Sequence, residues 1–375
     1  MLDDKLKALW ARISPPQKAA FFGCFLSGYL VHLYVFTNII PNSDGLSRIF
    51  DPQQMTVSGR WFLHYASFLN DFTQMPALIG FFSIVFLSLA AAGVVTALNL
   101  HSRALSAFAG VLMAAFPCLG YTFLYMFTAS AYCFAIFLAV LSVSLARRGR
   151  WHWLAGCLLL ACSMGTYQAY VTVAIGLSLL VIFRETLDPS ASFSAPLRLG
   201  VRLMLFLTAG AVLYYGILLV FLQVKDLELL DYLGMSDAGS GYPIAQLPGL
   251  ILSAYKQVFV FFFWPNGSNS FTTPLLAGLD LLALALAVAC FLAIVFRRAL
   301  WREPWRLIGA LVLAALLPLA VGFAQIIAPF SDATPIMKYA YVLVYMAVLL
   351  AADLGLSFPR GGWPPPAPWP CVWPG

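Results

Sequence analysis

Polar residues that could do chemistry gather in one window of an otherwise apolar chain, residues 42–61, NSDGLSRIFDPQQMTVSGRW. This window holds two acids, Asp44 and Asp51, and two arginines, Arg48 and Arg60. A carboxylate can act as a general base that takes a proton from a hydroxyl as it attacks a sugar carbon. A guanidinium can stabilise a departing phosphate. The window therefore holds the residue types that group transfer from a phosphate-bearing donor would need.

Each acid also has a plainer structural interpretation. Asp44 stands in Asn-Ser-Asp-Gly, where an Asx-type turn is common. Asp51 precedes Pro52, and Asp-Pro by itself usually indicates a turn. The choice between the two acids as base stays open. Two separated acids are weak support for a divalent metal, and the four histidines form no metal-binding motif, so no metal ligands are predicted.

The segment that begins at Arg60, RWFLHYASFLNDF, has helical periodicity. One face is apolar: Trp61, Phe62, Tyr65, Phe68, Leu69 and Phe72. The other face is polar: Arg60, His64, Ser67 and Asp71. We expect an interfacial helix with its apolar face in lipid. The polar face either meets water or walls a substrate site in which Arg60 faces a phosphate.

Three polar positions lie farther along the chain. Tyr167 and Gln168 interrupt a long apolar run, and a polar break at membrane depth is tolerated only against protein or a cavity. A tight outer turn is the alternative. Lys338 opens the last apolar segment and would reach a headgroup phosphate, or simply snorkel to the surface. Asp280 lies inside an apolar segment, where acids are functional candidates by default, although it is close enough to the end to be solvated.

The elements that carry these residues follow from composition. The chain of 375 residues is 62% hydrophobic and 10% charged, whereas soluble domains carry roughly a quarter charged residues. It is therefore predicted to be a polytopic membrane protein. The apolar runs show no period-two alternation, which favours helices over a barrel. The fold class is all-α, and the seven cysteines are small core residues.

About ten transmembrane helices are predicted from runs of the length that a bilayer requires. They cover residues 19–40, 76–98, 104–122, 123–146, two short spans within 151–183, 203–222, 275–296, 306–327 and 338–356. Residues 1–356 form one membrane-embedded domain. The Pro- and Trp-rich stretch 357–375 is expected to be disordered, with a frameshifted or truncated gene end as the alternative.

Charge distribution predicts the orientation. With the N-terminus inside, all but five of the 21 basic residues lie inside, as the positive-inside rule requires. The five on the outer side are Arg48, Arg60, Lys225, Lys256 and Lys338. The segment 250–264 is then interfacial or re-entrant, because a crossing would move Arg297 and Arg298 outside. More than half of the 15 acids lie outside, so chemistry is expected on the outer face.

The chain resembles the bacterial serotype-converting O-antigen glucosyltransferases (Gtr type) of the GT-C class. The resemblance rests on Asp44 after the first span, Ser58-Gly59-Arg60-Trp61, and Tyr167-Gln168. It implies an inner-membrane enzyme that uses polyprenyl-phosphate glucose on the periplasmic side, with a lipopolysaccharide O-antigen or another surface glycan as acceptor.

The resemblance also implies roles for single residues. Asp44 becomes the catalytic base, with Asp51 as the alternative. The residues expected at the substrates are Arg48, Arg60, Trp61, His64, Tyr167, Gln168 and Lys338. No cofactor beyond the lipid-linked donor and no nucleic-acid partner is expected. A flippase of lipid-linked sugar is the alternative function, but the concentration of acids on the outer face favours the enzyme.

Overall fold

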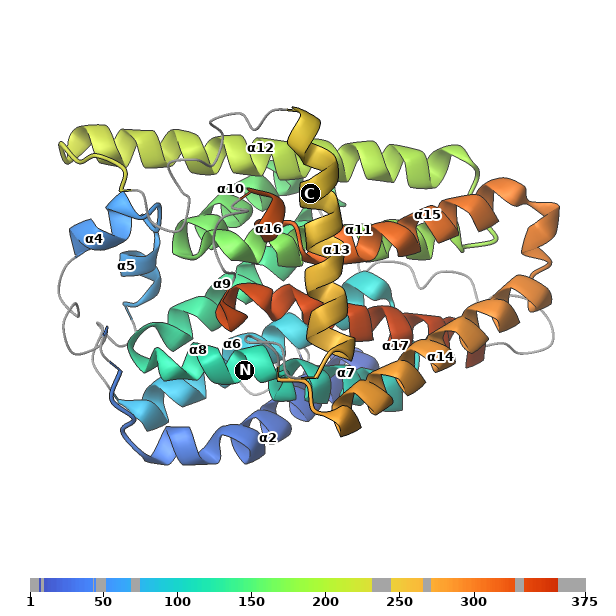
Figure 1. Cartoon of the computed structure of the whole chain (residues 1–375), viewed down its shortest axis with the longest axis horizontal. Helices are drawn as coiled ribbons and strands as arrows, with labels where there is room; N and C mark the ends of the chain where they lie inside the picture. Colours follow the sequence, from blue (N-terminus) through green and yellow to red (C-terminus); the bar gives the residue numbers. More distant parts are fainter. Residues whose placement is uncertain are drawn as a thin grey trace.

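The computed structural model describes residues 7, 10–42, 44, 52–68, 75–230, 244–265, 271–327 and 334–356, and all regular secondary structure in them is helical. Figure 1 shows these helices in one bundle. The longer helices are α2 (Pro15–Thr37), α6 (Pro76–Leu98), α7 (Arg103–Ala115), α8 (Pro117–Leu124), α9 (Met126–Ala146), α10 (Arg150–Thr166), α11 (Val171–Thr186), α12 (Ser194–Val224), α13 (Leu247–Phe263), α14 (Pro274–Arg297), α15 (Pro304–Val321) and α17 (Val342–Leu356). The short ones are α4 (Pro52–Val57), α5 (Leu63–Ala66), η1 (Gln168–Tyr170), η2 (Ile244–Gln246), η3 (Leu300–Arg302), α16 (Ala324–Ile327) and η4 (Pro335–Tyr341). The all-α prediction is confirmed.

Eight helical segments of the described chain are long and apolar enough to cross a membrane. They are α2, α6, α9, η1–α11, α12, α14, α15 and η4–α17. The pair α7–α8, bent by 43°, makes a ninth if both helices belong to one span. The helix α10, which has 17 residues and packs between α9 and α12, is not among these candidates, so the tenth predicted crossing stays a prediction. At 1.5 Å per residue α10 is about 25 Å long, slightly less than the hydrocarbon core.

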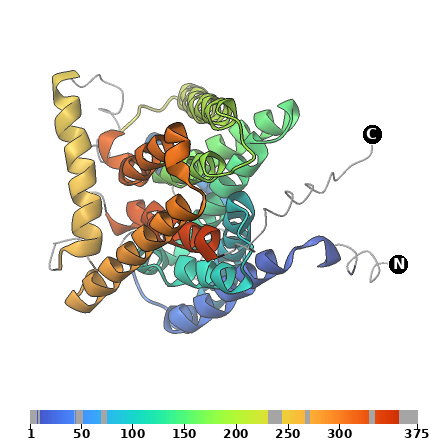
Figure 2. The ribbon, with the colours of Figure 1, turned by 90° about the vertical axis from the view of Figure 1, so that its right-hand side faces the viewer.

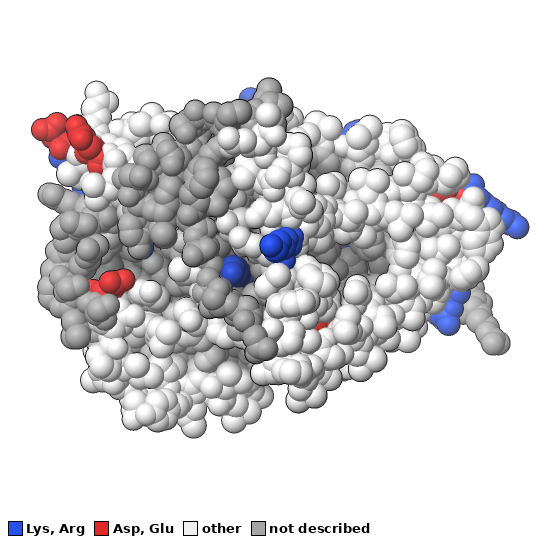
Figure 3. All heavy atoms as spheres, viewed as in Figure 1, with Lys and Arg blue, Asp and Glu red and all other residues white. Residues whose placement is uncertain are grey.

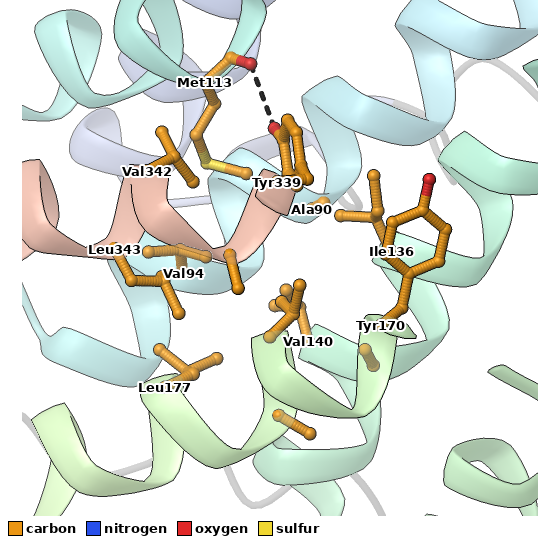
Figure 4. Close-up of a cluster of buried hydrophobic side chains, with 14 of the residues drawn as sticks. Ala90, Val94, Met113, Ile136, Val140, Tyr170, Leu177, Tyr339, Val342 and Leu343 are labelled. Carbon is orange, nitrogen blue, oxygen red and sulfur yellow. Dashed lines mark hydrogen bonds between the residues drawn. The ribbon is translucent and has the colours of Figure 1, made fainter. Parts of the chain in front are cut away.

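The bend between α7 and α8 has a local cause. Pro117 has no backbone N–H, so the carbonyl of Met113 loses its helical partner. The Tyr339 hydroxyl donates to that carbonyl at 2.9 Å (Figure 4). His32 Nε2 lies 2.9 Å from the next carbonyl, that of Ala114, and is the donor because a carbonyl oxygen only accepts. His32 therefore supplies a hydrogen bond to the end of α7.

Four arginines of the predicted inner side close the ends of neighbouring helices. Each donates to a carbonyl in the last turn of a helix other than its own, where carbonyls lack helical partners and the dipole is negative. The pairs are Arg147 to Ala97 (3.0 Å), Arg202 to Ala146 (2.6 Å), Arg297 to Gly355 (2.7 Å) and Arg306 to Thr186 (3.3 Å). Figure 3 shows basic side chains at one end of the molecule and near the centre of this face, and most visible acids toward the other end.

Helix α13 differs in direction from the rest of the bundle. It runs crosswise to α12 in Figure 1, and Figure 2 shows it on one side of the molecule. Within its 17 residues, Phe261 and Phe262 are buried. Their rings contact Tyr341 at centroid distances of 5.0 and 6.2 Å. This orientation agrees with the prediction that residues 250–264 do not cross the membrane.

Close helix packing depends on small residues. A Cβ atom at Gly110 of α7 would lie 2.1 Å from the carbonyl oxygen of Ala20 in α2, and one at Gly23 of α2 would lie 2.4 Å from that of Ala107. Such contacts are typical of membrane helix pairs, where small residues let backbones approach. The six described cysteines are unpaired and at least half-buried, as predicted for core residues.

Candidate active site at the first outer loop

The Ser58-Gly59-Arg60-Trp61 motif forms the turn that ends α4. The Arg60 N–H donates to the Met55 carbonyl at 2.8 Å, and the Gly59 N–H donates to the Thr56 carbonyl at 2.9 Å. This pair of bonds defines a Schellman motif, which needs a left-handed residue after the helix. Gly59 fills that position with φ 79°. The left-handed turn therefore requires the glycine of the motif. This turn sets the direction of the Arg60 and Trp61 side chains.

Two side chains from distant helices hold this turn by its carbonyls. Gln168 Nε2 donates to the carbonyl of Ser58 at 2.8 Å. The Tyr214 hydroxyl of α12 donates to the carbonyl of Gly59 at 3.0 Å. The structure thus brings the two sequence motifs into direct contact. Tyr214 gave no sequence signal, because it stands beside Tyr215 in an apolar helix.

Arg60 is half-buried and turned toward the bundle. Its Nε donates to the Ser58 hydroxyl at 3.0 Å, and its Nη1 donates to the Tyr132 hydroxyl of α9 at 3.3 Å. The Tyr132 ring in turn lies 5.0 Å from the ring of Tyr167. Arg60 and Tyr167, predicted to serve one site, are therefore both in contact with the same residue, Tyr132.

Trp61 is buried, which corrects the prediction that it faces lipid. Its ring stacks on Phe221 of α12 at 5.7 Å and lies against Gly165 of α10. The Phe62 N–H donates to the Gly165 carbonyl at 2.7 Å. Because Gly165 has no side chain, α10 leaves space for the indole. The indole N–H has no hydrogen-bond partner among the described residues, so ring contacts hold Trp61.

The interfacial helix is shorter than predicted in the part that the structure describes. The loop is helical in α4 and α5, but α5 is a single turn. Ser67, placed on the polar face by periodicity, is buried. Tyr65 and Phe68, expected on the lipid-facing side, are exposed, and so is His64. The insertion of Trp61 between α10 and α12 sets the direction of the chain and outweighs the amphipathic pattern. Leu69, Asp71 and Phe72 lie outside the described residues.

Asp44 lies in the turn that the structural interpretation predicted. Its backbone N–H donates to Asn42 Oδ1 at 2.9 Å, so Asn42 is the Asx residue of the turn. The Asp44 side chain is exposed. Asp51 and Arg48 lie outside the described residues, so the choice of base stays a prediction. The described residues contain no group of three or more potential metal ligands.

Lys338 lies on η4, which packs against both η1 and α8. Its side chain is only 8% exposed. A lysine that snorkels along a lipid-facing surface would keep its ammonium in solvent. Lys338 instead lies inside the bundle next to the element that carries Gln168, while the neighbouring Tyr339 joins the buried cluster around Tyr170 (Figure 4).

Comparison with known families is consistent with this arrangement. The profile described as Glucosyl transferase GtrII matches residues 33–351, which include the outer loop and both motifs. The chain belongs to the GtrII glucosyl transferase family. This GtrII protein is therefore a glucosyltransferase with a multi-pass helical membrane domain. No curated protein and no solved structure matches the chain.

Proposed function

We propose that this GtrII protein moves glucose from a polyprenyl-phosphate donor to a periplasmic O-antigen or another cell-surface glycan at the bacterial inner membrane. The observation that carries the proposal is the hydrogen bond from Gln168 to the Ser58 carbonyl. This hydrogen bond joins the outer loop to the helix break at Tyr167 and Gln168. It keeps the Arg60 cation among helices at the acidic end of the molecule. A phosphate at the membrane surface would meet this cation.

The proposed reaction is a displacement at the anomeric carbon. The carboxylate of Asp44, or of Asp51, accepts the proton of an acceptor hydroxyl. The hydroxyl oxygen forms a bond to glucose C1, and the bond between C1 and the phosphate oxygen breaks. The lipid phosphate leaves with the electron pair, and Arg60 stabilises its charge. Lys338 and Arg48 are the additional cations proposed for this phosphate, and His64 and Tyr167 are proposed to contact substrate.

Turnover in detergent tests the enzyme against the flippase. Purified protein, polyprenyl-phosphate glucose and a glycan acceptor should give glucosylated product without a sealed bilayer. A pure carrier would give none. Loss of glucose from the surface polysaccharide of cells that lack the gene would identify the acceptor class.

Variants of the two acids test the base. Asp44→Asn and Asp51→Asn should be compared for kcat at equal amounts of folded protein. Loss of a general base typically costs on the order of 10²–10⁴-fold in rate. We expect that loss in Asp44→Asn and a smaller one in Asp51→Asn. The reverse order would assign the base to Asp51, and normal turnover in both variants would refute a carboxylate base in this loop.

A further inference from the structure

Two tyrosines that lie outside both sequence motifs form hydrogen bonds to the outer loop through their hydroxyl groups. Tyr214 of α12 donates to the Gly59 carbonyl at 3.0 Å, and Tyr132 of α9 accepts from Arg60 Nη1 at 3.3 Å. Both rings are more than nine-tenths buried. Phenylalanine would fill the same apolar space, so the packing of the helices alone does not explain the two hydroxyl groups.

The hydroxyl of Tyr214 belongs to a small hydrogen-bond network. It also interacts with the side chain of Gln168, which itself donates to the Ser58 carbonyl. Two successive carbonyls of the turn, those of Ser58 and Gly59, are thereby fixed by two side chains that contact each other. The backbone immediately before Arg60 is held from α12 and from η1 at once.

Tyr132 acts at the other end of the same side chain. Arg60 Nε is fixed by the Ser58 hydroxyl at 3.0 Å, and Nη1 is directed by Tyr132. The Tyr132 ring is itself held by contacts with Tyr167 at 5.0 Å and Tyr170 at 6.1 Å. The orientation of the guanidinium plane is therefore determined by a rigid aromatic cluster of the bundle.

We infer that Tyr214 and Tyr132 are positioning residues that hold the Arg60 guanidinium where the donor phosphate departs. The inference rests on the proposed function of Arg60. A guanidinium recognises phosphate through a planar fork of donors, so its direction matters as much as its charge. Misplacement of a catalytic group by about 1 Å can cost on the order of 100-fold in rate.

The test compares three single-hydroxyl deletions. Tyr214→Phe and Tyr132→Phe each remove one contact to the loop. Tyr215→Phe is the matched control, because Tyr215 is adjacent on α12 and 54% exposed. We expect the first two variants to lower kcat/KM for polyprenyl-phosphate glucose about 10- to 100-fold and to raise the inhibition constant of free polyprenyl phosphate. Their thermal unfolding midpoints should stay near that of the Tyr215→Phe protein.

A double-variant comparison separates positioning from general stabilisation. In an Arg60→Gln background, Tyr214→Phe should have little further effect on turnover or on polyprenyl phosphate binding, because the residue that it positions is gone. An equal loss in both backgrounds would overturn the inference, as would identical kinetics of Tyr214→Phe and Tyr215→Phe in active protein. Wild-type protein that neither binds polyprenyl phosphate nor transfers glucose would refute the proposed function itself.

Discussion

At the scale of single residues, the candidate site depends on two glycines. Gly59 allows the left-handed turn that ends α4, and Gly165 allows Trp61 to reach α10. Neither glycine does chemistry. Gly59 allows the backbone angle that sets the position of Arg60. Gly165 leaves the space that sets the position of Trp61.

The variant Gly59→Ala should weaken the outer loop. A left-handed conformation costs a residue with a Cβ roughly 1–2 kcal/mol. We expect a lower thermal unfolding midpoint and reduced glucosyl transfer. Gly216→Ala in α12 is the control, because a Cβ there meets nothing within 4 Å, and it should match the wild type. Unchanged activity in Gly59→Ala would show that the turn tolerates another geometry.

The variant Gly165→Ala should displace Trp61. Its Cβ would lie 2.6 Å from Trp61 Cε2, and the indole is already confined by Phe221. Overpacking of this kind typically costs about 1–3 kcal/mol. Limited proteolysis within the first outer loop should become faster, whereas Gly120→Ala, with open space at its Cβ, should leave it unchanged. Equal proteolysis rates would mean that Trp61 does not anchor the loop.

At the scale of elements, the crossing of α2 and α7 leaves no room for a methyl group. In Gly110→Ala the new Cβ would lie 2.1 Å from the Ala20 carbonyl oxygen, a backbone atom that moves only with its helix. We expect a clear drop in the unfolding midpoint in detergent. Gly278→Ala in α14, where a Cβ contacts nothing within 4 Å, is the comparison. Similar midpoints for the two variants would contradict the close crossing.

Asp280 has a structural role at this scale. It accepts a 2.6 Å hydrogen bond from Tyr345, which pins the largely exposed helix α14 to α17. Asp280→Asn keeps an acceptor oxygen and should keep activity. Asp280→Leu should lose stability, by roughly 1 kcal/mol for a hydrogen bond between membrane helices. Abolished glucosyl transfer in a well-folded Asp280→Asn protein would instead make the charge functional.

At the scale of the whole molecule, the two charged ends should lie on opposite sides of the membrane. Single cysteines at the exposed positions Glu228 and Arg302 test this in intact cells, since the described native cysteines are buried or half-buried. We expect a membrane-impermeant maleimide that reaches the periplasm to label Glu228→Cys but not Arg302→Cys. Arg302→Cys should react only after the membrane is opened. Labelling of both in sealed cells would overturn the orientation.

Properties that depend on neighbouring residues could be predicted from short stretches of sequence. Apolar run length gave the helices, the distribution of arginines gave the expected orientation, and the polar pair Tyr167 and Gln168 marked the break that η1 now occupies. These signals are local, because insertion into a bilayer depends on a short stretch of chain. The roles of Asp44 and Asp51 stay predictions.

The contacts between the motifs could not be predicted in this way, because they depend on tertiary packing. The contact of Gln168 with Ser58 spans 110 positions, and that of Tyr214 with Gly59 spans 155. Periodicity placed Trp61 in lipid, but the space beside Gly165 buried it. Packing partners so distant in sequence leave no pattern in either segment, because shape complementarity exists only once the helices are assembled. The setting of Arg60 is therefore a property of the bundle.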